Sequence, residues 1–330
     1  MNKRRIIWIE LLRIFACIGV IGIHAASQHF RDVPVNTSVW AVTNFYHGIN
    51  RFAVACFVMI SGCLYLDRKR TWNLKKLWMH NILPIAVAYV FWQVFYAFYR
   101  GLVNEGLKFG SAYFLKRFLV MISDSYFHLW YLPTLFWFVL TAWLLDKALS
   151  PAAARAAKLV LVVALPACYQ LLFTEWFWAV KSYFQQGAFF FLGCVLPREK
   201  AEQHAKPLML FGALCGLWVV WGLLFPTMVW PDGLLAEAVC TWVDYFAVSG
   251  FCVGIWAACV LLQKPLRRLV PLGQNTMLFY LYHQPFCCAV PGLVLYEKLG
   301  VSAGGTVLVC GAVSLVMPYL FCRLAGRLHL

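Results

Sequence analysis

Long apolar stretches separated by short polar segments run through most of the chain. A helix needs about 20 apolar residues to cross a bilayer. The pattern therefore predicts an all-α, polytopic membrane bundle of about ten spanning helices. The first ends near Ala26, and the others are expected at about 44–66, 78–100, 127–146, 158–174, 180–197, 207–226, 241–262, 275–296 and 305–323. With such short connections, residues 1–330 are expected to form one membrane domain without an appended soluble domain.

Two segments need separate interpretation. The basic N-terminus and the apolar run behind it could be mistaken for a signal peptide. The run contains Glu10 and Arg13 and is long enough to span, so it fits a first membrane helix better. The stretch 105–124 places Lys108, Lys116 and Arg117 among Phe and Leu residues, which is typical of an amphipathic surface helix.

Composition excludes several classes of protein. The 330 residues are 63% hydrophobic and only 12% charged. Soluble domains have about 25% charged residues, so this chain lacks the charge to coat a water-soluble globule. A soluble enzyme and a disordered, nucleic-acid-binding protein are both excluded, and no nucleic-acid partner is expected.

The distribution of the basic residues along the chain predicts the topology. With a cytoplasmic N-terminus, nineteen of the 28 basic residues fall at the cytoplasmic side, Lys158 among them, and eight fall outside. Because Lys and Arg accumulate in cytoplasmic loops, both termini are predicted to be cytoplasmic. This bias accounts for most of the net charge without an acidic partner.

The thirteen cysteines give no support for a metal site. They are scattered, mostly within apolar runs, and show neither CxxC spacing nor a Cys/His cluster. We interpret them as small packing residues. No metal and no bound cofactor is expected.

The first predicted helix carries three ionisable residues, Glu10, Arg13 and His24. Such residues inside a span are costly and mark candidate functional sites. At 100° per residue, Arg13 and His24 lie about 20° apart around the helix axis, and Glu10 lies about 60° from Arg13. One stripe thus presents an acid, a guanidinium and an imidazole. The alternative is an interfacial Glu10–Arg13 pair and a packed histidine at the helix end.

Later spans contain weaker candidates. Arg51 either stabilises negative charge or extends to the outer headgroups. Ser61, followed by Gly62, either meets the substrate or belongs to a close helix contact. Aromatic belts explain Trp130 and the tyrosines near residue 280. His128 and His283 are less readily explained by contact with lipid.

Together these residues resemble a known family. Ile9-Glu10-Leu11-Leu12-Arg13 followed by Ile23-His24 resembles the opening of the acyltransferase-3 family of bacterial membrane acyltransferases. Arg51 with Phe57-Val58-Met59-Ile60-Ser61-Gly62 is similar to its second-helix signature. His128-Leu129-Trp130-Tyr131 and the stretch from Leu272-Gly273 to Tyr280-Leu281-Tyr282-His283 follow in the family's order. The resemblance covers about residues 6–323 and is greatest to single-domain members that O-acetylate surface polysaccharides, such as the enterobacterial common antigen type.

The resemblance implies an activity. It suggests acetyl-CoA as a substrate held at the cytoplasmic face, and a sugar hydroxyl of a cell-surface or lipid-linked glycan as acceptor at the outer side. His24 is then the general base, Arg13 orients the thioester arm or shields developing charge, and Glu10 fixes Arg13. Arg51 and Ser61 are candidate oxyanion donors. The substrate-binding set is Arg51, Ser61, His128, Trp130 and His283, and the location is a bacterial inner membrane.

The chain departs from the family in two places. Glu10 stands where Asp is usual, which keeps the charge. The paired arginines that the family often has at the start of the third helix are replaced by a stretch containing Lys75, Lys76 and His80. These residues can engage donor phosphates, but as point charges without the bidentate fork of arginine.

Two other classes of function stay open. A proton-coupled carrier, or a flippase of lipid-linked sugar, would also contain buried Glu, Arg and His, but it should show internal symmetry between halves. A structural subunit that had lost its chemistry should have lost the stripe on the first helix. The acceptor hydroxyl, the oligomeric state and the organism are not predicted by the sequence.

Overall fold

The computed structural model is all-α over the residues that it describes, with no strand among them. The described residues are 6–27, 34, 37–68, 74–103, 116, 127–172, 178–196, 198–224, 234–273, 276, 280, 283, 293–302, 305–306, 308–313, 316 and 320. Contacts group the chain into two compact units, Met1–Ile60 with Pro197–Leu330, and Ser61–Leu196. Helix α3 (Phe52–Arg68) begins in the first unit and continues into the second.

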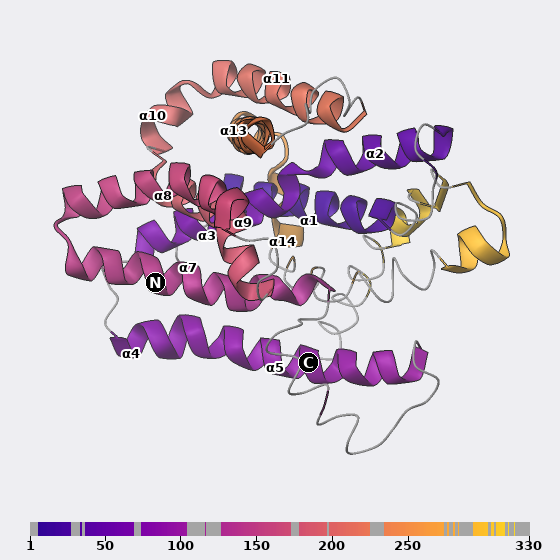
Figure 1. The fold of residues 1–330 in the computed structure, drawn as a ribbon, viewed down its shortest axis with the longest axis horizontal. Helices are drawn as coiled ribbons and strands as arrows, with labels where there is room; N and C mark the ends of the chain where they lie inside the picture. Colours follow the sequence, from indigo (N-terminus) through magenta and orange to yellow (C-terminus); the bar gives the residue numbers. More distant parts are fainter. Residues whose placement is uncertain are drawn as a thin grey trace. The chain divides into compact units, whose positions relative to one another are not determined.

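The first unit is built around α1 (Ile7–Ser27), which packs against α2, α13 and α14. The other described helices of this unit are α2 (Ser38–Asn50), α10 (Arg198–Gln203), α11 (Ala205–Leu224), α13 (Leu234–Leu262) and α14 (Val270–Gly273) (Figure 1). A 3₁₀ turn lies at Arg267–Leu269, and a π-helical segment lies at Leu293–Lys298. The last segment leads to Gly300, whose φ of 64° is a left-handed conformation that glycine adopts without strain. The core of the unit contains the inner face of α1.

Glycines set the closest contact of the first unit, between α11 and α13. A Cβ atom on Gly212 would collide with the Cα of Gly254, and one on Gly250 would lie 2.5 Å from the sulfur of Cys215. Both helices carry glycines four residues apart, which is the spacing that lets membrane helices approach at the backbone. The two helices lie together in Figure 1, where α13 is seen end-on.

Among the described residues of the second unit, four long helices follow α3. They are α5 (Leu83–Val103), α7 (Tyr131–Ala148), α8 (Pro151–Leu172) and α9 (Trp178–Val195). Shorter segments lie at Leu74–Leu77 (α4), Trp78–Ile82 (η2) and Phe127–Trp130 (η3). Helix α9 packs against α7 and α8. At Gly62 of α3, a Cβ atom would collide with the backbone oxygen of Phe190 in α9. The predicted close helix contact at this glycine is therefore present.

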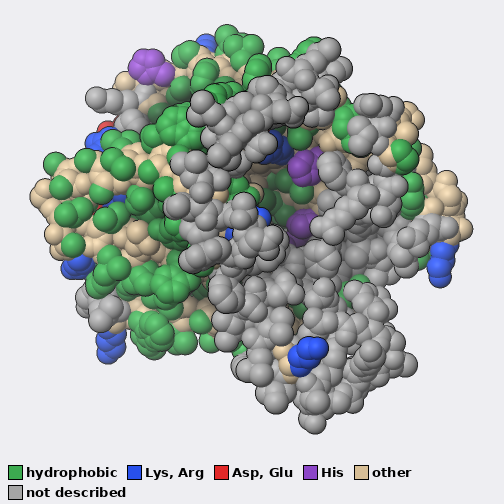
Figure 2. Space-filling model, viewed as in Figure 1, with side chains coloured by type: hydrophobic (Ala, Val, Ile, Leu, Met, Phe, Trp, Pro, Cys, Tyr) green, Lys and Arg blue, Asp and Glu red, His purple; other side chains and the backbone are tan. Residues whose placement is uncertain are grey.

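Six helical segments among the described residues are long and apolar enough to cross a membrane. They are Ile7–His24, Ser38–Tyr65, His128–Ala148, Pro151–Tyr169, Ala205–Leu224 and Val239–Leu262, and Leu83–Tyr99 is a shorter apolar helix. Hydrophobic side chains cover much of the described surface in Figure 2, with few charged ones between them. The protein is a multi-pass membrane protein. The predicted helix at 105–124 and the last two predicted spans lie largely outside the described residues, so the count of ten stays a prediction.

Two predicted boundaries are wrong. The span expected at 44–66 begins earlier, at Ser38, because Thr37 caps α2 by accepting a hydrogen bond from the backbone of Trp40. It is also interrupted at Arg51, between α2 and α3. The span expected at 158–174 begins at Pro151, where the Ser150 hydroxyl accepts from the backbone of Ala153 and proline occupies the first helical position.

Candidate active site

The acidic end of the predicted stripe forms an ion pair. Arg13 Nη1 donates to Glu10 Oε1 at 3.0 Å, one turn apart on α1. The Glu10 side chain is 11% exposed and that of Arg13 is 27% exposed. Gly273 covers Glu10 from α14, since a Cβ atom on Gly273 would lie 2.8 Å from Glu10 Oε2. The Glu10 carboxylate thus accepts a hydrogen bond from Arg13 and packs against Gly273, while the Arg13 guanidinium stays partly exposed.

The other end of the stripe is a pair of histidines. The ring centroids of His24 and His283 lie 5.1 Å apart, with the rings tilted by 46°. His283 is fully buried and His24 is partly exposed. The ring of Tyr280 also lies near His283, at a centroid distance of 6.5 Å. The structure therefore brings together two predicted site residues from distant parts of the sequence, and His24 is the more exposed of the two.

A third histidine, His47 of α2, was not predicted as a site residue. It lies close enough to His24 to interact with it electrostatically, and it interacts in the same way with Arg51, one turn further along the chain. Its spacing from Arg51 could have drawn attention to it, but its approach to His24 depends on how α1 and α2 pack.

The two ends of the stripe are well separated. His24 follows Arg13 by eleven positions on one helix, which corresponds to about 16 Å along the helix axis. They share a side of α1 but cannot contact the same atom. Any chemistry that involves both must use an extended substrate.

Asn50 lies against two glycines close to His24. A Cβ atom on Gly22 would be 2.5 Å from the Asn50 side-chain nitrogen, and one on Gly19 would be 2.7 Å from the Cβ of Ala53. Asn50 itself donates to the backbone oxygen of Tyr46 at 2.7 Å. The histidine end of α1 is thus packed directly onto the junction between α2 and α3.

Arg51 is bound to an acidic residue that the sequence analysis did not single out. Its Nη1 and Nη2 atoms donate to the two carboxylate oxygens of Asp244 in α13 at 2.7 and 2.6 Å. The Arg51 side chain is 28% exposed and that of Asp244 is 15% exposed. The Arg51 guanidinium and the Asp244 carboxylate therefore form a bidentate ion pair within the first unit.

The remaining predicted substrate-binding residues belong to the second unit. The Ser61 hydroxyl lies 2.8 Å from that of Tyr131. His128 is buried with its ring edge-to-face with Tyr96, at a centroid distance of 5.5 Å, and Trp130 ends the 3₁₀ turn beside it. Ser61 lies on α3, and His128 and Trp130 both lie in the 3₁₀ turn before α7. Ser61 is therefore close to Tyr131, whereas His128 packs against α5.

The predicted donor-binding residues lie at the start of the α4–α5 segment. Lys75 is exposed on α4. The side chains of Lys76 and His80 lie outside the described part of the chain. Directly after the lysines, Trp78–Ile82 forms one π-helical turn, a feature often found at functional sites. The segment thus carries an exposed cation beside an irregular helical turn.

The second unit also holds a buried ion pair. Asp146 accepts a hydrogen bond from Lys158 Nζ at 2.6 Å and from the Tyr65 hydroxyl at 2.8 Å. The Lys158 side chain is only 3% exposed. Lys158, the first residue of the span expected at 158–174, lies within α8, which begins at Pro151 and brings Lys158 against Asp146. The three residues tie α3, α7 and α8 together.

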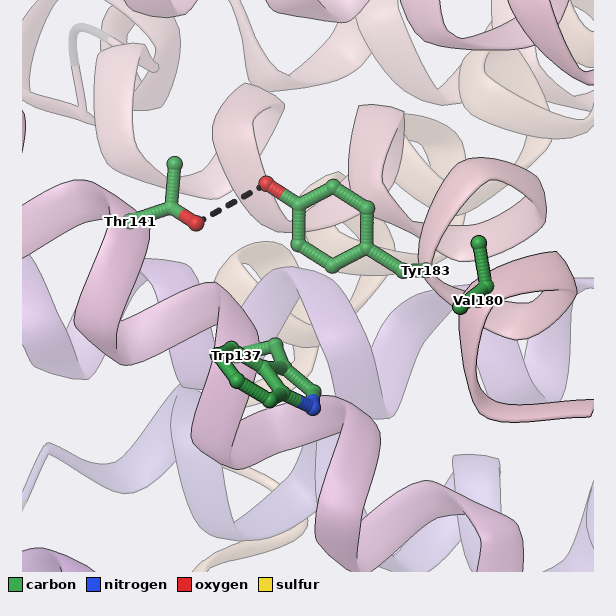
Figure 3. Close-up of a pocket in the computed structure, with 4 residues that line it drawn as sticks. All are labelled: Trp137, Thr141, Val180 and Tyr183. Carbon is green, nitrogen blue, oxygen red and sulfur yellow. Dashed lines mark hydrogen bonds between the residues drawn. The ribbon is translucent and has the colours of Figure 1, made fainter. Parts of the chain in front are cut away.

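A small open pocket of about 220 Å³ lies between α7 and α9. Figure 3 shows Trp137 and Thr141 on one helix and Val180 and Tyr183 on the other, with the Tyr183 hydroxyl donating to that of Thr141 at 3.0 Å. The described lining is mostly apolar, with the hydroxyl pair and the Trp137 indole as its polar groups. None of the four described lining residues is a predicted catalytic residue.

Comparison with known proteins gives one match. A family model described as an acyltransferase domain, the acyltransferase-3 model, matches residues 6–322. The match spans both units and includes every predicted site residue. No curated protein and no solved structure matches the chain.

Proposed function

The chain belongs to the acyltransferase-3 family and is a membrane acyltransferase, and on that premise we propose that it O-acetylates a glycan. In this proposal it moves an acetyl group from cytoplasmic acetyl-CoA to a sugar hydroxyl of a cell-surface or lipid-linked glycan, in a bacterial inner membrane. The observation that carries the proposal is the partly exposed His24 beside the buried His283, on the helix that holds the Glu10–Arg13 pair.

His24 acts as the general base. A neutral imidazole removes the proton of the acceptor hydroxyl as its oxygen attacks the thioester carbonyl. The carbon–sulfur bond then breaks, and the proton passes from His24 to the departing CoA sulfur. Positioned proton transfer of this kind contributes about 10²–10⁴-fold to a rate. The buried His283 packs against the His24 ring and positions it.

Arg13 holds the donor at a distance from the reacting carbonyl. Because it lies about 16 Å from His24 along α1, it cannot shield charge on the carbonyl that His24 serves. Contact with an extended part of the donor, such as the thioester arm, is compatible with this separation. Glu10 fixes the Arg13 guanidinium by a charge-assisted hydrogen bond of 3.0 Å.

The donor phosphates bind at the cytoplasmic face. The basic segments 67–76, 198–206 and 264–268 supply positive potential there. Within the first of them, exposed Lys75 supports direct contact, and Lys76 and His80 complete the proposed set. Ser61, His128 and Trp130 stay candidates for acceptor contacts in the second unit.

The test compares glycans from cells that lack the protein. Surface glycans and lipid-linked precursors are analysed by mass spectrometry after complementation with wild type or His24→Ala, at matched membrane expression. We expect wild type to restore one acetyl mass per repeat and His24→Ala to restore none. An acetyl mass restored by both proteins would remove His24 as the base. If no acylation depends on the protein, the O-acetyltransferase proposal fails.

A binding measurement separates the enzyme from a carrier. The purified protein in detergent should gain thermal stability when CoA is added, because a donor site binds the folded state. A carrier of lipid-linked sugar should show no such gain.

A further inference from the structure

Arg51 and Asp244 form a two-point, long-range ion pair within the first unit. Both nitrogen–oxygen distances are below 2.8 Å, and the two residues are 193 positions apart in the sequence. The fork of Arg51 is thus already filled by a carboxylate. A guanidinium in this state is a poor direct donor to a reacting oxyanion, because binding one would require it to leave Asp244.

The pair fastens the junction of α2 and α3 to α13. Arg51 is the single residue between the two helices. Its neighbour Phe52 packs its ring on that of Phe251 at a centroid distance of 5.1 Å, and its backbone oxygen accepts from the thiol of Cys252 at 3.5 Å. Asp244, Phe251 and Cys252 follow one face of α13, because seven or eight residues make about two turns.

The opposite side of the junction meets α1 next to His24. Asn50, directly before Arg51, fills the space left by Gly22, which is two residues before His24. Ala53, two residues after Arg51, faces Gly19 in the same way. The junction is therefore held by α13 on one side and contacts the histidine end of α1 on the other.

From this geometry we propose that Asp244 is a positioning residue that acts through Arg51. It holds the junction of α2 and α3 against α1 and thereby sets the orientation of His24. The inference deepens the proposed function and rests on it for the role of His24. It also assigns Arg51 to the framework of the site and not to the oxyanion.

Paired neutral substitutions test this inference. Removing one partner leaves an uncompensated charge among apolar residues, whereas removing both does not. The variants are Asp244→Asn, Arg51→Gln, the double variant Arg51→Gln/Asp244→Asn, and Asp244→Glu, which keeps the carboxylate. Each is purified in detergent, and the folded fraction is matched by thermal unfolding.

Two quantities are measured. The first is transfer from radiolabelled acetyl-CoA to solubilised membranes of the deletion strain, with kcat and the KM for acetyl-CoA. The second is the rate at which diethyl pyrocarbonate modifies His24, read by peptide mass spectrometry, with exposed His204 as internal reference. The second measurement reports the surroundings of His24 without requiring any transfer.

We expect each neutral single variant to lose about tenfold to a hundredfold in kcat, as small misplacements of catalytic groups do. The KM for acetyl-CoA should stay within about twofold, because the donor is held elsewhere, and the modification rate of His24 should change relative to that of His204. The double variant should recover to within about threefold of wild type, and Asp244→Glu should retain more activity than Asp244→Asn.

Two results would overturn the inference. A double variant no more active than Arg51→Gln would assign Arg51 to the substrate. Wild-type rates of transfer and of His24 modification in Asp244→Asn would remove Asp244 from the site. If wild type transfers no acetyl group, the proposed function fails instead, and the His24 modification rates alone decide whether Asp244 positions this residue.

Discussion

Two histidines of unequal exposure meet at the end of α1, and we expect them to have different tasks. In the proposed mechanism the partly exposed His24 meets the substrate, whereas the fully buried His283 acts through its neighbours. A buried ring 5.1 Å away packs against His24 and restricts its rotamers. His283 is thus a positioning residue for the proposed base.

Substitution of His283 separates its shape from its polarity. His283→Phe keeps a ring of similar size, and His283→Asn keeps a hydrogen-bonding group. If polarity matters, His283→Phe should lose about tenfold to a hundredfold in kcat, His283→Asn should lose less, and the KM for acetyl-CoA should change little. Exposed His204→Ala is the control and should match wild type. Wild-type kcat in His283→Phe would contradict this prediction.

At the scale of helices, the contact between α3 and α9 depends on one glycine. A Cβ atom on Gly62 would collide with the backbone oxygen of Phe190 and lie 3.0 Å from the backbone nitrogen of Cys194. Backbone atoms cannot turn aside as a side chain can, so the two helices must separate to accept a methyl group.

Gly62→Ala should therefore destabilise the protein, by about 1–3 kcal/mol if it behaves as other overpacked contacts do. Thermal unfolding in detergent should show a Tm lower by several degrees. Gly311→Ala is the matched control, because no atom of the described residues lies within 4 Å of the added Cβ, and its Tm should stay at or above that of wild type. Equal Tm values for the two variants would show that α3 and α9 are not limited by this contact.

Helix periodicity predicts what lies within one helix and cannot predict what meets across helices. Glu10, Arg13 and His24 could be placed on one side of α1 because their spacing alone fixes their directions. The bond between Arg51 and Asp244, by contrast, depends on how α13 packs. The same limit applies to His47. The interruption at Arg51 is not predictable from periodicity, because Arg51 keeps helical dihedrals and changes the backbone hydrogen bonding only locally, donating to the Gly48 oxygen.

For the whole molecule, hydropathy predicts an all-α membrane protein, and the distribution of Lys and Arg predicts its orientation in the membrane. The six spanning segments among the described residues follow apolar runs closely, because a bilayer requires both length and low polarity. Buried charge is less predictable. The sequence predicts Lys158 at the polar edge of a span, yet its side chain is buried. Its charge is compensated by Asp146, which also accepts a hydrogen bond from Tyr65.

The distribution of Lys and Arg leads to a prediction for the chain as a whole. Nineteen of 28 basic residues fall on the side that holds both termini, so both should face the cytoplasm. Green fluorescent protein fused after residue 330 should fluoresce, since it folds in the cytoplasm. Alkaline phosphatase fused after residue 232, in a predicted outer loop, should be active, since it requires export. The reverse pair of signals would invert the molecule and place His24 at the cytoplasmic side, where the acetyl group would reach it without crossing the bilayer.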